Sequence, residues 1–365
     1  NARGDIEKLP AWFLDDLLVL LAGEWEAWRR GETEWLERVL IHGGQLVLMK
    51  RRKVWDKIPA RLIIIDATAN TEIYRQMFPE REIEVYEPAV QQKGSIFQVT
   101  GSYLGISQMK NDTESTRRAS VCRAICDAEG YENPGVVSFM AAEASFRAAG
   151  FTNFAHFGGQ RGSNALADCD AGFIVGSFSP PDVAIMDMVK MLKPGRLNRF
   201  SVQKLDNGYL VPIRTDRLIE YHYQDGDGRS PWRVVSGLWN DPDLHAAMQS
   251  RREAEMLQAV HRFRPLTRNV PVWVFSSIPM DLQLSAVWDD PPLGPDGIDW
   301  RVWLKIKDKV PAAETITIYD LAEWSGVGRE WITRKNWLQA IMDYYANEWT
   351  PIKIGRKAAI GRCEL

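Results

Sequence analysis

Apolar and polar positions follow two patterns that alternate over much of the chain. Short apolar runs bounded by polar or glycine-rich segments predict strands, and the four consecutive apolar residues at 62–65 predict a strand buried on both faces. Between the runs, apolar residues recur every three or four positions, which predicts helices, as at 112–131 and 241–264. This alternation favours an α/β fold with a parallel sheet. The runs that predict strands are "ARLIIIDATAN", "REIEVYEP", "SIFQVTGSY", "PGVVSFMA", "TNFAHFGG", "AGFIVGSF" and "VPVWVFSSIP".

Turn residues mark where this alternation is interrupted. Asn207-Gly208 and residues 225–228 each centre a predicted β-hairpin, so residues from about 195 to 240 are interpreted as a β-hairpin insertion. Prolines and glycines in "WDDPPLGPDGIDW" predict that the domain ends near 288. Beyond them, a short helix, a glycine-containing turn, a longer helix at 329–346 and a two-stranded ribbon predict a winged helix. The expected boundaries are a helical segment at 1–59, the α/β domain with its insertion at 60–288, a linker at 289–311 and the winged-helix domain at 312–365.

Composition narrows the class of protein only slightly. The 365 residues are 45% hydrophobic and 25% charged, and the formal net charge is -3, so nucleic-acid binding would need a local basic patch. The four cysteines lack zinc spacing, and we expect neither a disulfide scaffold nor a metal site. The apolar stretch near the N-terminus is broken by Asp15 and Asp16 and is too short to cross a bilayer. We therefore expect a cytoplasmic protein that does not contact membranes.

Polar segments follow several of the predicted strands. "DATAN", "AAE", "GGQRGSN" and "GSFSPP" are expected to gather at the carboxyl edge of the sheet, where open α/β sheets bind ligands. The segment "QAVHRFRP" ends a predicted helix with two arginines that flank a phenylalanine. These arginines could simply neutralise the helix terminus. They could also reach a nucleotide phosphate, because a guanidinium has a permanent charge and a planar fork that matches phosphate oxygens.

The order of these segments resembles the second RecA-like domain of superfamily 2 helicases. "LIIIDATAN" is similar to the family's motif III, "VVSFMA" to motif IV, "HFGGQRGSNALADCDAGFIVGSF" to motif V and "QAVHRFRP" to motif VI. The combination "DATA", "RGSN" and "QAVHRFRP" resembles phage- and plasmid-type replication helicases, over roughly residues 60–280. The resemblance implies a RecA-like parallel sheet, that is, a P-loop NTPase fold without its P-loop.

The resemblance also implies roles for particular residues. Arg262 and Arg264 would be the arginine-finger pair of ATP hydrolysis, with Gln258 beside them, and Asp66 and Thr68 would relay between nucleotide and nucleic acid. The residues that would contact a nucleic-acid backbone are Arg161, Gly162, Ser163 and Asn164.

Departures from the family pattern limit what the chain can do alone. Position 261 is His where many members have Gly, and the two arginines are closely spaced, which leaves open which one is the finger. The chain contains neither G-x-x-x-x-G-K-[ST] nor a DEAD-like tetrad, the parts that hold phosphates and Mg²⁺. We therefore expect ATP and Mg²⁺ to bind only when a first RecA-like domain, in the same polypeptide or a separate chain, completes the site, and this chain alone to hydrolyse nothing.

The C-terminal module carries a local positive charge. Residues 301–365 hold 6 Lys and 5 Arg against 3 Asp and 5 Glu, a balance of +3. This charge favours binding of duplex DNA, although a winged helix can also serve protein contact. The basic residues expected to contact DNA are Arg329, Arg334 and Lys335 on the second helix and Lys353, Arg356 and Lys357 on the ribbon.

Several of these features also have a purely structural interpretation. Ser163 and Asn164 could form an ordinary turn, and His156 and His261 could be structural. The resulting hypothesis is the C-terminal part of an ATP-dependent helicase in DNA replication or repair, with DNA, single- or double-stranded, as its partner. The alternative is a nucleic-acid-binding regulator that has a helicase-like fold without motor function. A small-molecule α/β enzyme is a third class, disfavoured because no nucleophile elbow or triad spacing is found.

Overall fold

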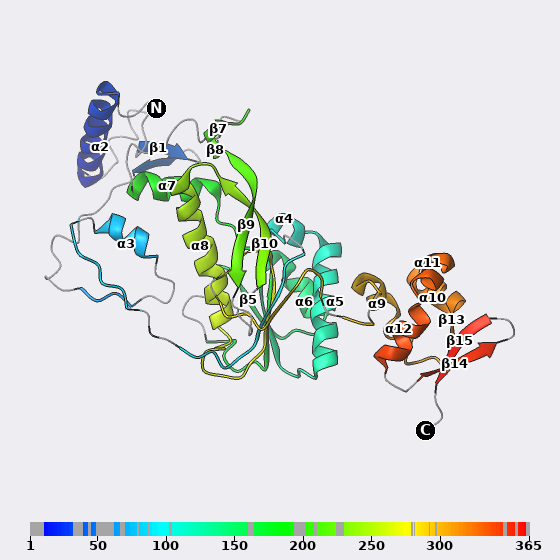
Figure 1. Ribbon diagram of the computed structural model, residues 1–365. Helices are drawn as coiled ribbons and strands as arrows, with labels where there is room; N and C mark the ends of the chain where they lie inside the picture. The colour runs from blue at the N-terminus through cyan, green and yellow to red at the C-terminus, as the bar shows by residue number, and fades with distance from the viewer. Residues whose placement is uncertain are drawn as a thin grey trace. The chain divides into compact units, whose positions relative to one another are not determined.

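A computed structural model describes most of the chain (Figure 1). Within the described residues, no helix is both long and apolar enough to span a membrane. The described residues are 11–31, 39–42, 45–48, 62–65, 70–78, 80–86, 88, 90–101, 104–159, 164–192, 202–206, 210–223, 230–278, 280, 282–291, 293–295, 298–345, 349–354 and 357–362.

The chain divides into two compact units. The first comprises Asn1–Val90, Phe178–Tyr221 and Arg233–Gln258, and the second comprises Gln91–Ser177, His222–Trp232 and Ala259–Leu365. Helix α8, Pro242–His261, begins in the first unit and ends in the second.

The core of the first unit lies between α7, Asp182–Leu192, and the first half of α8. Ile185 and Leu244 are almost completely buried there, together with Trp239. The other elements that begin in this unit are α2 Ala11–Arg29, β1 Val39–His42, β2 Gln45–Leu48, α3 Thr71–Met77, β7 Val202–Lys204, β8 Leu210–Pro212 and β9 Arg214–Tyr223. Strand β10, Ser230–Trp239, begins in the second unit and ends in the first.

Strands pair in both regions where hairpins were predicted. β7 and β8 are antiparallel, with Gln203 opposite Val211, and β9 and β10 are neighbours in a separate two-stranded sheet. The two turns themselves, Asn207-Gly208 and residues 225–228, lie outside the described residues.

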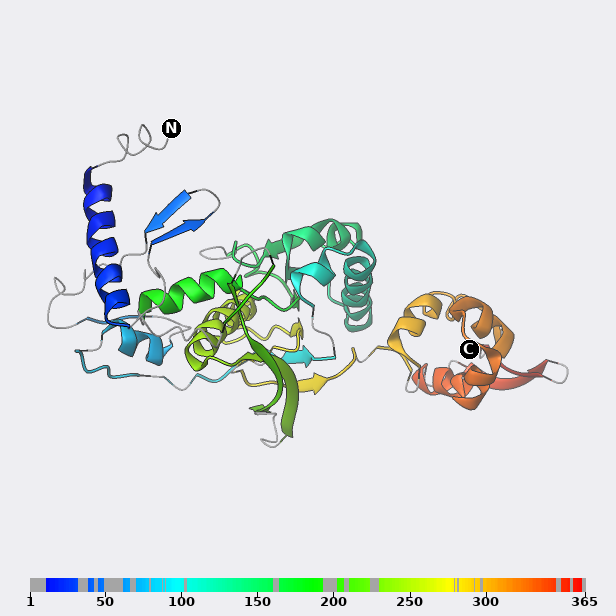
Figure 2. The same cartoon turned by 90° about the horizontal axis from the view of Figure 1, so that it is seen from above.

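The second unit contains a six-stranded sheet, which confirms the predicted α/β fold with a parallel sheet. The strand order is β12-β3-β11-β6-β4-β5, and all five neighbouring pairs are parallel. Figure 2 shows β3, in cyan, beside β12, in gold. The strands are β3 Ile96–Val99, β4 Pro134–Ser138, β5 Asn153–His156, β6 Ala171–Val175, β11 Val272–Phe275 and β12 Ala286–Trp288.

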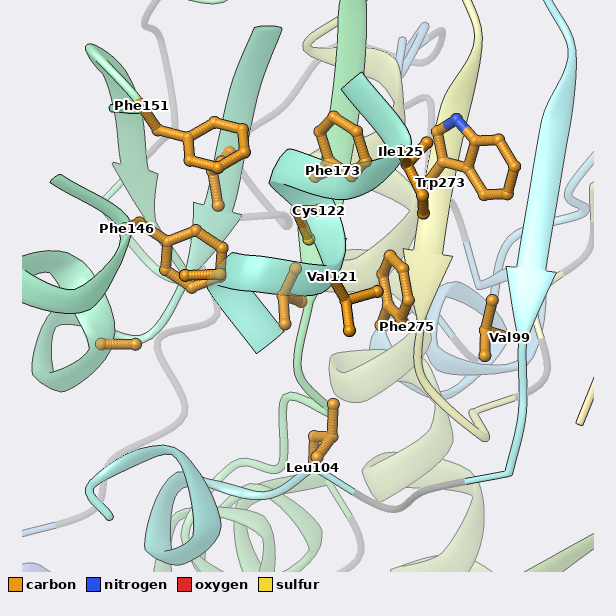
Figure 3. Packing of buried hydrophobic residues seen from close by; sticks show 14 of the residues in the cluster. Val99, Leu104, Val121, Cys122, Ile125, Phe146, Phe151, Phe173, Trp273 and Phe275 are labelled. Carbon is orange, nitrogen blue, oxygen red and sulfur yellow. The ribbon is translucent and has the colours of Figure 1, made fainter. Parts of the chain in front are cut away.

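One face of this sheet is covered by α5, Asp112–Glu129. The helix begins at Asn111, whose side chain accepts a hydrogen bond from the Glu114 backbone N–H (3.1 Å), and ends at the left-handed Gly130. Its apolar side chains meet those of β6 and β11 in one buried cluster (Figure 3). The central strands are buried along their whole length, as expected for a parallel sheet covered on both faces. Three short helices complete this part, α4 Ile106–Met109, η2 Met140–Ala142 and α6 Glu143–Ala148.

Two predicted strands differ from the structure. Residues 62–65 form no strand, and Ile63 and Ile65 are 87% and 97% exposed, although a continuous apolar run predicted burial on both faces. Residues 82–86, predicted as a strand from "REIEVYEP", also lack regular structure, and Tyr86 is 87% exposed. The physical reason for both differences is that these segments have no strand in the six-stranded sheet to pair with. A strand forms only where a neighbouring backbone accepts its hydrogen bonds, and neither segment joins the six-stranded sheet.

The C-terminal elements have a core of their own. Strands β13, β15 and β14 form one antiparallel sheet in that order, and Trp337, Ile341 and Ile332 pack in the cluster beside it. The elements are α9 Trp300–Ile306, β13 Thr315–Thr317, α10 Ile318–Ser325, α11 Arg329–Arg334, α12 Trp337–Tyr344, β14 Trp349–Ile354 and β15 Lys357–Arg362.

Two expectations for this region are refined by the structure. The single helix expected at 329–346 is two helices, because Asn336 adopts a left-handed backbone with φ 51° between α11 and α12. The range expected to be a linker, 289–311, contains α9, because Trp300, Trp303 and Ile306 are apolar and buried.

Candidate functional site

Phe263 anchors the segment that follows α8. The Phe263 N–H donates to the Val260 carbonyl (3.2 Å), and the side chain is completely buried. A Cβ atom added to Gly172 would lie 2.6 Å from the Phe263 ring, and one added to Gly135 would lie 2.9 Å from it. Strands β6 and β4 therefore have glycine where the ring packs. The phenylalanine between the two arginines is a packing residue, and it fixes the backbone from which they project.

The two glycines also locate the ring on the sheet. Successive side chains of a strand point to opposite faces, and the neighbours Phe173 and Val136 belong to the cluster under α5. Phe263 consequently packs on the sheet face opposite α5.

Arg264 occupies an unusual backbone conformation. Its φ is 59°, in the left-handed region that costs a residue other than glycine roughly 1–2 kcal/mol. Its carbonyl accepts hydrogen bonds from the N–H groups of Thr267 (3.0 Å) and Arg268 (2.9 Å), which close a tight turn. Its side chain is exposed, whereas Arg262 is half-buried. Backbone strain that the surrounding structure maintains is more frequent at functional sites than elsewhere.

The turn lies at the amino end of the parallel sheet. The Pro265 carbonyl accepts hydrogen bonds from the N–H groups of Lys93 (3.0 Å) and Gly94 (2.7 Å), just before β3 begins. The Arg268 guanidinium donates to the Ala167 carbonyl, a few residues before β6 begins. These contacts connect the arginine turn to the starts of two strands.

Asn164 lies at this same end of the sheet. Its carbonyl accepts a hydrogen bond from the Ala167 N–H (3.0 Å), and Ala167 is the residue held by Arg268. The Asp170 carboxylate then accepts from the backbone N–H groups of Glu132 (2.7 Å) and Asn133 (2.8 Å), directly before β4. The exposed Asn164 side chain and the exposed Arg264 side chain therefore share one edge.

This arrangement corrects, for Asn164, the expectation that the polar segments gather at the carboxyl edge. Gly158 and Gly159 of "GGQRGSN" follow the carboxyl end of β5, whereas Asn164 lies at the amino end of the sheet. "GSFSPP" begins at Gly176, directly after the carboxyl end of β6. The physical reason is that β5 and β6 are parallel, so the chain must return from the carboxyl end to the amino end between His156 and Ala171.

Four polar side chains near the carboxyl edge have structural roles. The Ser177 and Ser276 hydroxyls are hydrogen-bonded to each other (2.8 Å), and the Ser138 hydroxyl donates to the Val175 carbonyl (2.6 Å). The Gln98 amide donates to the carbonyls of Ser276 (2.8 Å) and Ile278 (2.9 Å). The four side chains are completely buried and join neighbouring strands.

The amino edge carries charges of both signs. Lys93 and Arg264 are exposed, and Arg262 and Arg268 are half-buried. The acids at the same end are the exposed Glu132 and Asp168 and the half-buried Asp170. Burial lowers the pKa of His261 below its ordinary value, so the imidazole is neutral at physiological pH. The exposed Arg264 guanidinium and Lys93 ammonium are the donors at this edge that suit an anionic ligand.

Cys169 lies at this edge as a weakly acidic thiol. Burial, with a smaller contribution from Asp170, raises the pKa of Cys169 to about 11, and the nearby Arg268 only partly opposes the rise. The thiol is therefore protonated at neutral pH and cannot act as a nucleophile.

The remaining candidates are only partly described. Gln258 is half-buried on α8, and Arg329, Arg334 and Lys335 are exposed on α11 or directly after it. Lys353 and Lys357 lie on the paired strands β14 and β15, where Lys357 is opposite Ile354. The candidates outside the described residues are Asp66, Thr68, Arg161, Gly162, Ser163 and Arg356.

Sequence reasoning missed Lys93 and Arg268. Both reach the edge through hydrogen bonds between segments far apart in the sequence, Lys93 to Pro265 and Arg268 to Ala167. The only available signal was their position immediately before predicted strands.

Comparison with known proteins adds nothing to what the geometry shows about the chemistry of this edge. Among the described side chains, no group of three or more His, Cys, Asp or Glu residues could hold a metal ion. No family model, curated protein or solved structure matches the chain.

Proposed function

We propose that the chain carries the second RecA-like domain of a superfamily 2 helicase of the phage- and plasmid-type replication group, followed by a winged-helix domain. The observation that supports this most is the Phe263 anchor, which holds Arg262 and Arg264 at the sheet end where Asn164 lies. The parallel sheet is compatible with a RecA-like fold. Residues 195–240 would be a β-hairpin insertion in this domain.

The arginine turn would complete an ATP site on another domain. A first RecA-like domain, in the same polypeptide or in a separate chain, would hold ATP and Mg²⁺, since this sequence contains no Gly-Lys dipeptide of a phosphate loop. Asn164 would lie next to the nucleotide or the nucleic-acid backbone.

Arg264 is the better candidate for the arginine finger. Its side chain is exposed on a tight turn, whereas Arg262 is half-buried and closer to the anchor. A guanidinium fixed in this way can donate hydrogen bonds to the phosphate oxygens where negative charge develops in the transition state. Arg262 would support the turn and contribute a second positive charge.

The C-terminal elements would bind nucleic acid. Their order, helix, strand, helix, two short helices and a two-stranded ribbon, fits a winged helix. Arg329, Arg334 and Lys335 are exposed at the position of the recognition helix, in a region whose charge balance is +3.

The test is the steady-state ATPase activity of the complete enzyme, with the first RecA-like domain present. Arg264→Ala should lower kcat by roughly 10³-fold with little change in KM, because a finger acts mainly in the transition state. Arg264→Lys should not restore turnover, because an ammonium lacks the planar fork.

Arg251→Ala is the matched control, since Arg251 is an exposed arginine on α8. It should leave kcat unchanged. Full turnover by Arg264→Ala and Arg262→Ala would contradict the proposal. A complete enzyme that binds nucleic acid without turning over ATP would support the non-motor regulator instead.

A further inference from the structure

Three large aromatic rings are exposed on the short helices of the C-terminal module, and one of them, Tyr344 on α12, packs edge-on against Trp303 and Tyr345. Tyr319 on α10 is 45% exposed, and Trp331 on α11 is 41% exposed. The same helices bury Leu321 and Ile332 almost completely in the core of the module. The rings therefore project from elements that are fixed by packing, and they are unrelated to the arginine turn of the parallel sheet.

Tyr319 and Trp331 each have a cation over the ring. The Arg329 guanidinium lies 4.7 Å from the centre of the Tyr319 ring, and the Lys335 ammonium lies 5.9 Å from the centre of the Trp331 ring. The buried Trp337 braces Trp331 edge-on, with ring centres 5.3 Å apart and an interplanar angle of 88°. Such pairs stabilise an exposed surface only slightly. They also occur at Trp300 and Trp324, so what distinguishes Tyr319 and Trp331 is the exposure of their rings.

The charges around the rings favour an anionic partner. Between 329 and 335, three cations, Arg329, Arg334 and Lys335, stand against one acid, Glu330. On α10, Asp320 is used in the capping box, where it accepts hydrogen bonds from the Thr317 N–H (2.7 Å) and hydroxyl (2.6 Å). Glu323, four residues after Tyr319 on the same helix, is exposed, so the three cations stand against two exposed acids, Glu330 and Glu323. An aromatic ring beside a cation matches a nucleotide, in which a flat base lies next to a phosphate.

We propose that Tyr319 and Trp331 stack on the bases of single-stranded nucleic acid, while Arg329, Arg334 and Lys335 hold its phosphates. The inference rests on the proposed nucleic-acid role of this module and specifies single-stranded nucleic acid as its ligand, in place of the duplex expected from the sequence. In a duplex both faces of a base are covered by its neighbours, so an exposed ring can stack only on an unpaired base.

The experiment is fluorescence anisotropy of the full chain with a short fluorescein-labelled oligothymidylate and with a duplex of the same length. Tyr319→Ala and Trp331→Ala should each raise the Kd for the single strand about tenfold. Tyr319→Phe and Trp331→Phe should remain close to the unmodified protein, because phenylalanine keeps a stacking face. Thermal unfolding of every variant establishes that the module is folded.

The salt dependence of Kd distinguishes the contribution of base stacking from that of phosphate binding. The ring variants should keep the slope of log Kd against log salt, whereas Arg334→Ala together with Lys335→Ala should flatten it by about 1.4 on a single strand. Tyr86→Ala is the matched control, because Tyr86 is 87% exposed, lies outside the module and should not affect binding.

Three binding results would overturn the inference, and so would the absence of binding. These are single-strand binding that survives the double change Tyr319→Ala and Trp331→Ala, equal losses in the Phe and Ala variants, or tighter binding to the duplex with the ring variants unaffected. Absence of any nucleic-acid binding would also overturn it and would point to a protein partner for this surface. None of these outcomes alters the ATPase test of Arg264, so the two proposals can fail separately.

Discussion

The two ends of the parallel sheet use polar side chains in opposite ways. At the carboxyl end, Ser138, Ser177 and Ser276 are completely buried, and their hydroxyls join neighbouring strands. At the amino end, Lys93 and Arg264 are exposed, and backbone hydrogen bonds together with the Phe263 ring hold the turn that presents them. A polar residue that follows a strand is therefore weak evidence of a functional site. Stronger evidence is an exposed polar side chain on a backbone segment that hydrogen bonds and packing hold in place.

The largest expected effect on stability comes from removing the ring that anchors the amino end of the sheet. Phe263→Ala should lower the free energy of unfolding by roughly 3–5 kcal/mol, because a fully buried ring is replaced by a cavity. Urea denaturation followed by circular dichroism measures it.

Gly172→Ala provides the matched test of the same contact. Alone it should destabilise by about 1–3 kcal/mol, because its methyl group would lie 2.6 Å from the Phe263 ring. In the Phe263→Ala background that cost should largely disappear. Independent, additive effects of the two substitutions would show that the ring is not packed on this glycine.

The next effect addresses the carboxyl end. Ser177→Ala removes one partner of the buried hydroxyl pair with Ser276, and we expect a loss of about 1–3 kcal/mol in unfolding free energy. ATP turnover of the complete enzyme should not change, because this end is structural. A loss of turnover larger than the loss of folded protein would assign a functional role to the carboxyl end.

A smaller effect separates stability from function at the arginine turn. Arg264→Gly should raise the unfolding free energy of the folded chain by up to about 1 kcal/mol, because glycine adopts a φ of 59° without strain, although greater chain entropy in the unfolded state offsets part of the gain. Thermal unfolding measures the change. Arg264→Ala retains the strain and is the control. A destabilised glycine variant would mean that the Arg264 side chain makes contacts worth more than the strain it imposes.

The smallest effect is the dependence of stability on pH. Burial lowers the pKa of His261, so the unfolded chain binds this proton more readily than the folded one. The contribution is fully present above the ordinary histidine pKa of about 6.5 and is lost as pH falls through that value toward the lower folded pKa. His261→Gln should flatten the fall in stability below pH 7, measured by denaturation at several pH values. His245, whose pKa is lowered by burial and by Arg252, should keep part of the slope.

Sequence patterns predicted the strands that pair with one another. "PGVVSFMA", "AGFIVGSF" and "VPVWVFSSIP" became β4, β6 and β11, because runs of apolar residues flanked by turns suit a sheet covered on both faces. The same pattern at 62–65 did not, since periodicity reports hydrophobicity and does not reveal whether a neighbouring strand exists.

The candidate site was less accessible to such reasoning. Resemblance to motifs selected Arg262, Arg264 and Asn164. The rule that open α/β sheets bind ligands at the carboxyl ends of their strands placed the segment with Asn164 at that end. Their common location depends on the return of the chain between β5 and β6 and on the Arg268 contact with Ala167, both of which are tertiary facts. The function of Phe263 was also invisible, because the glycines it packs on belong to two other strands.

The strand order has a consequence for synthesis of the chain. β3 is made early, yet both of its neighbours in the sheet, β11 and β12, are made late. Roughly 170 residues separate β3 from β11, so at typical translation rates a ribosome needs about 10–30 s to supply the first neighbour. During that time the β3 backbone has neither of its final partners, while β4, β5 and β6 can already pair. The sheet should therefore be completed from one side, with its oldest strand among the last to be enclosed.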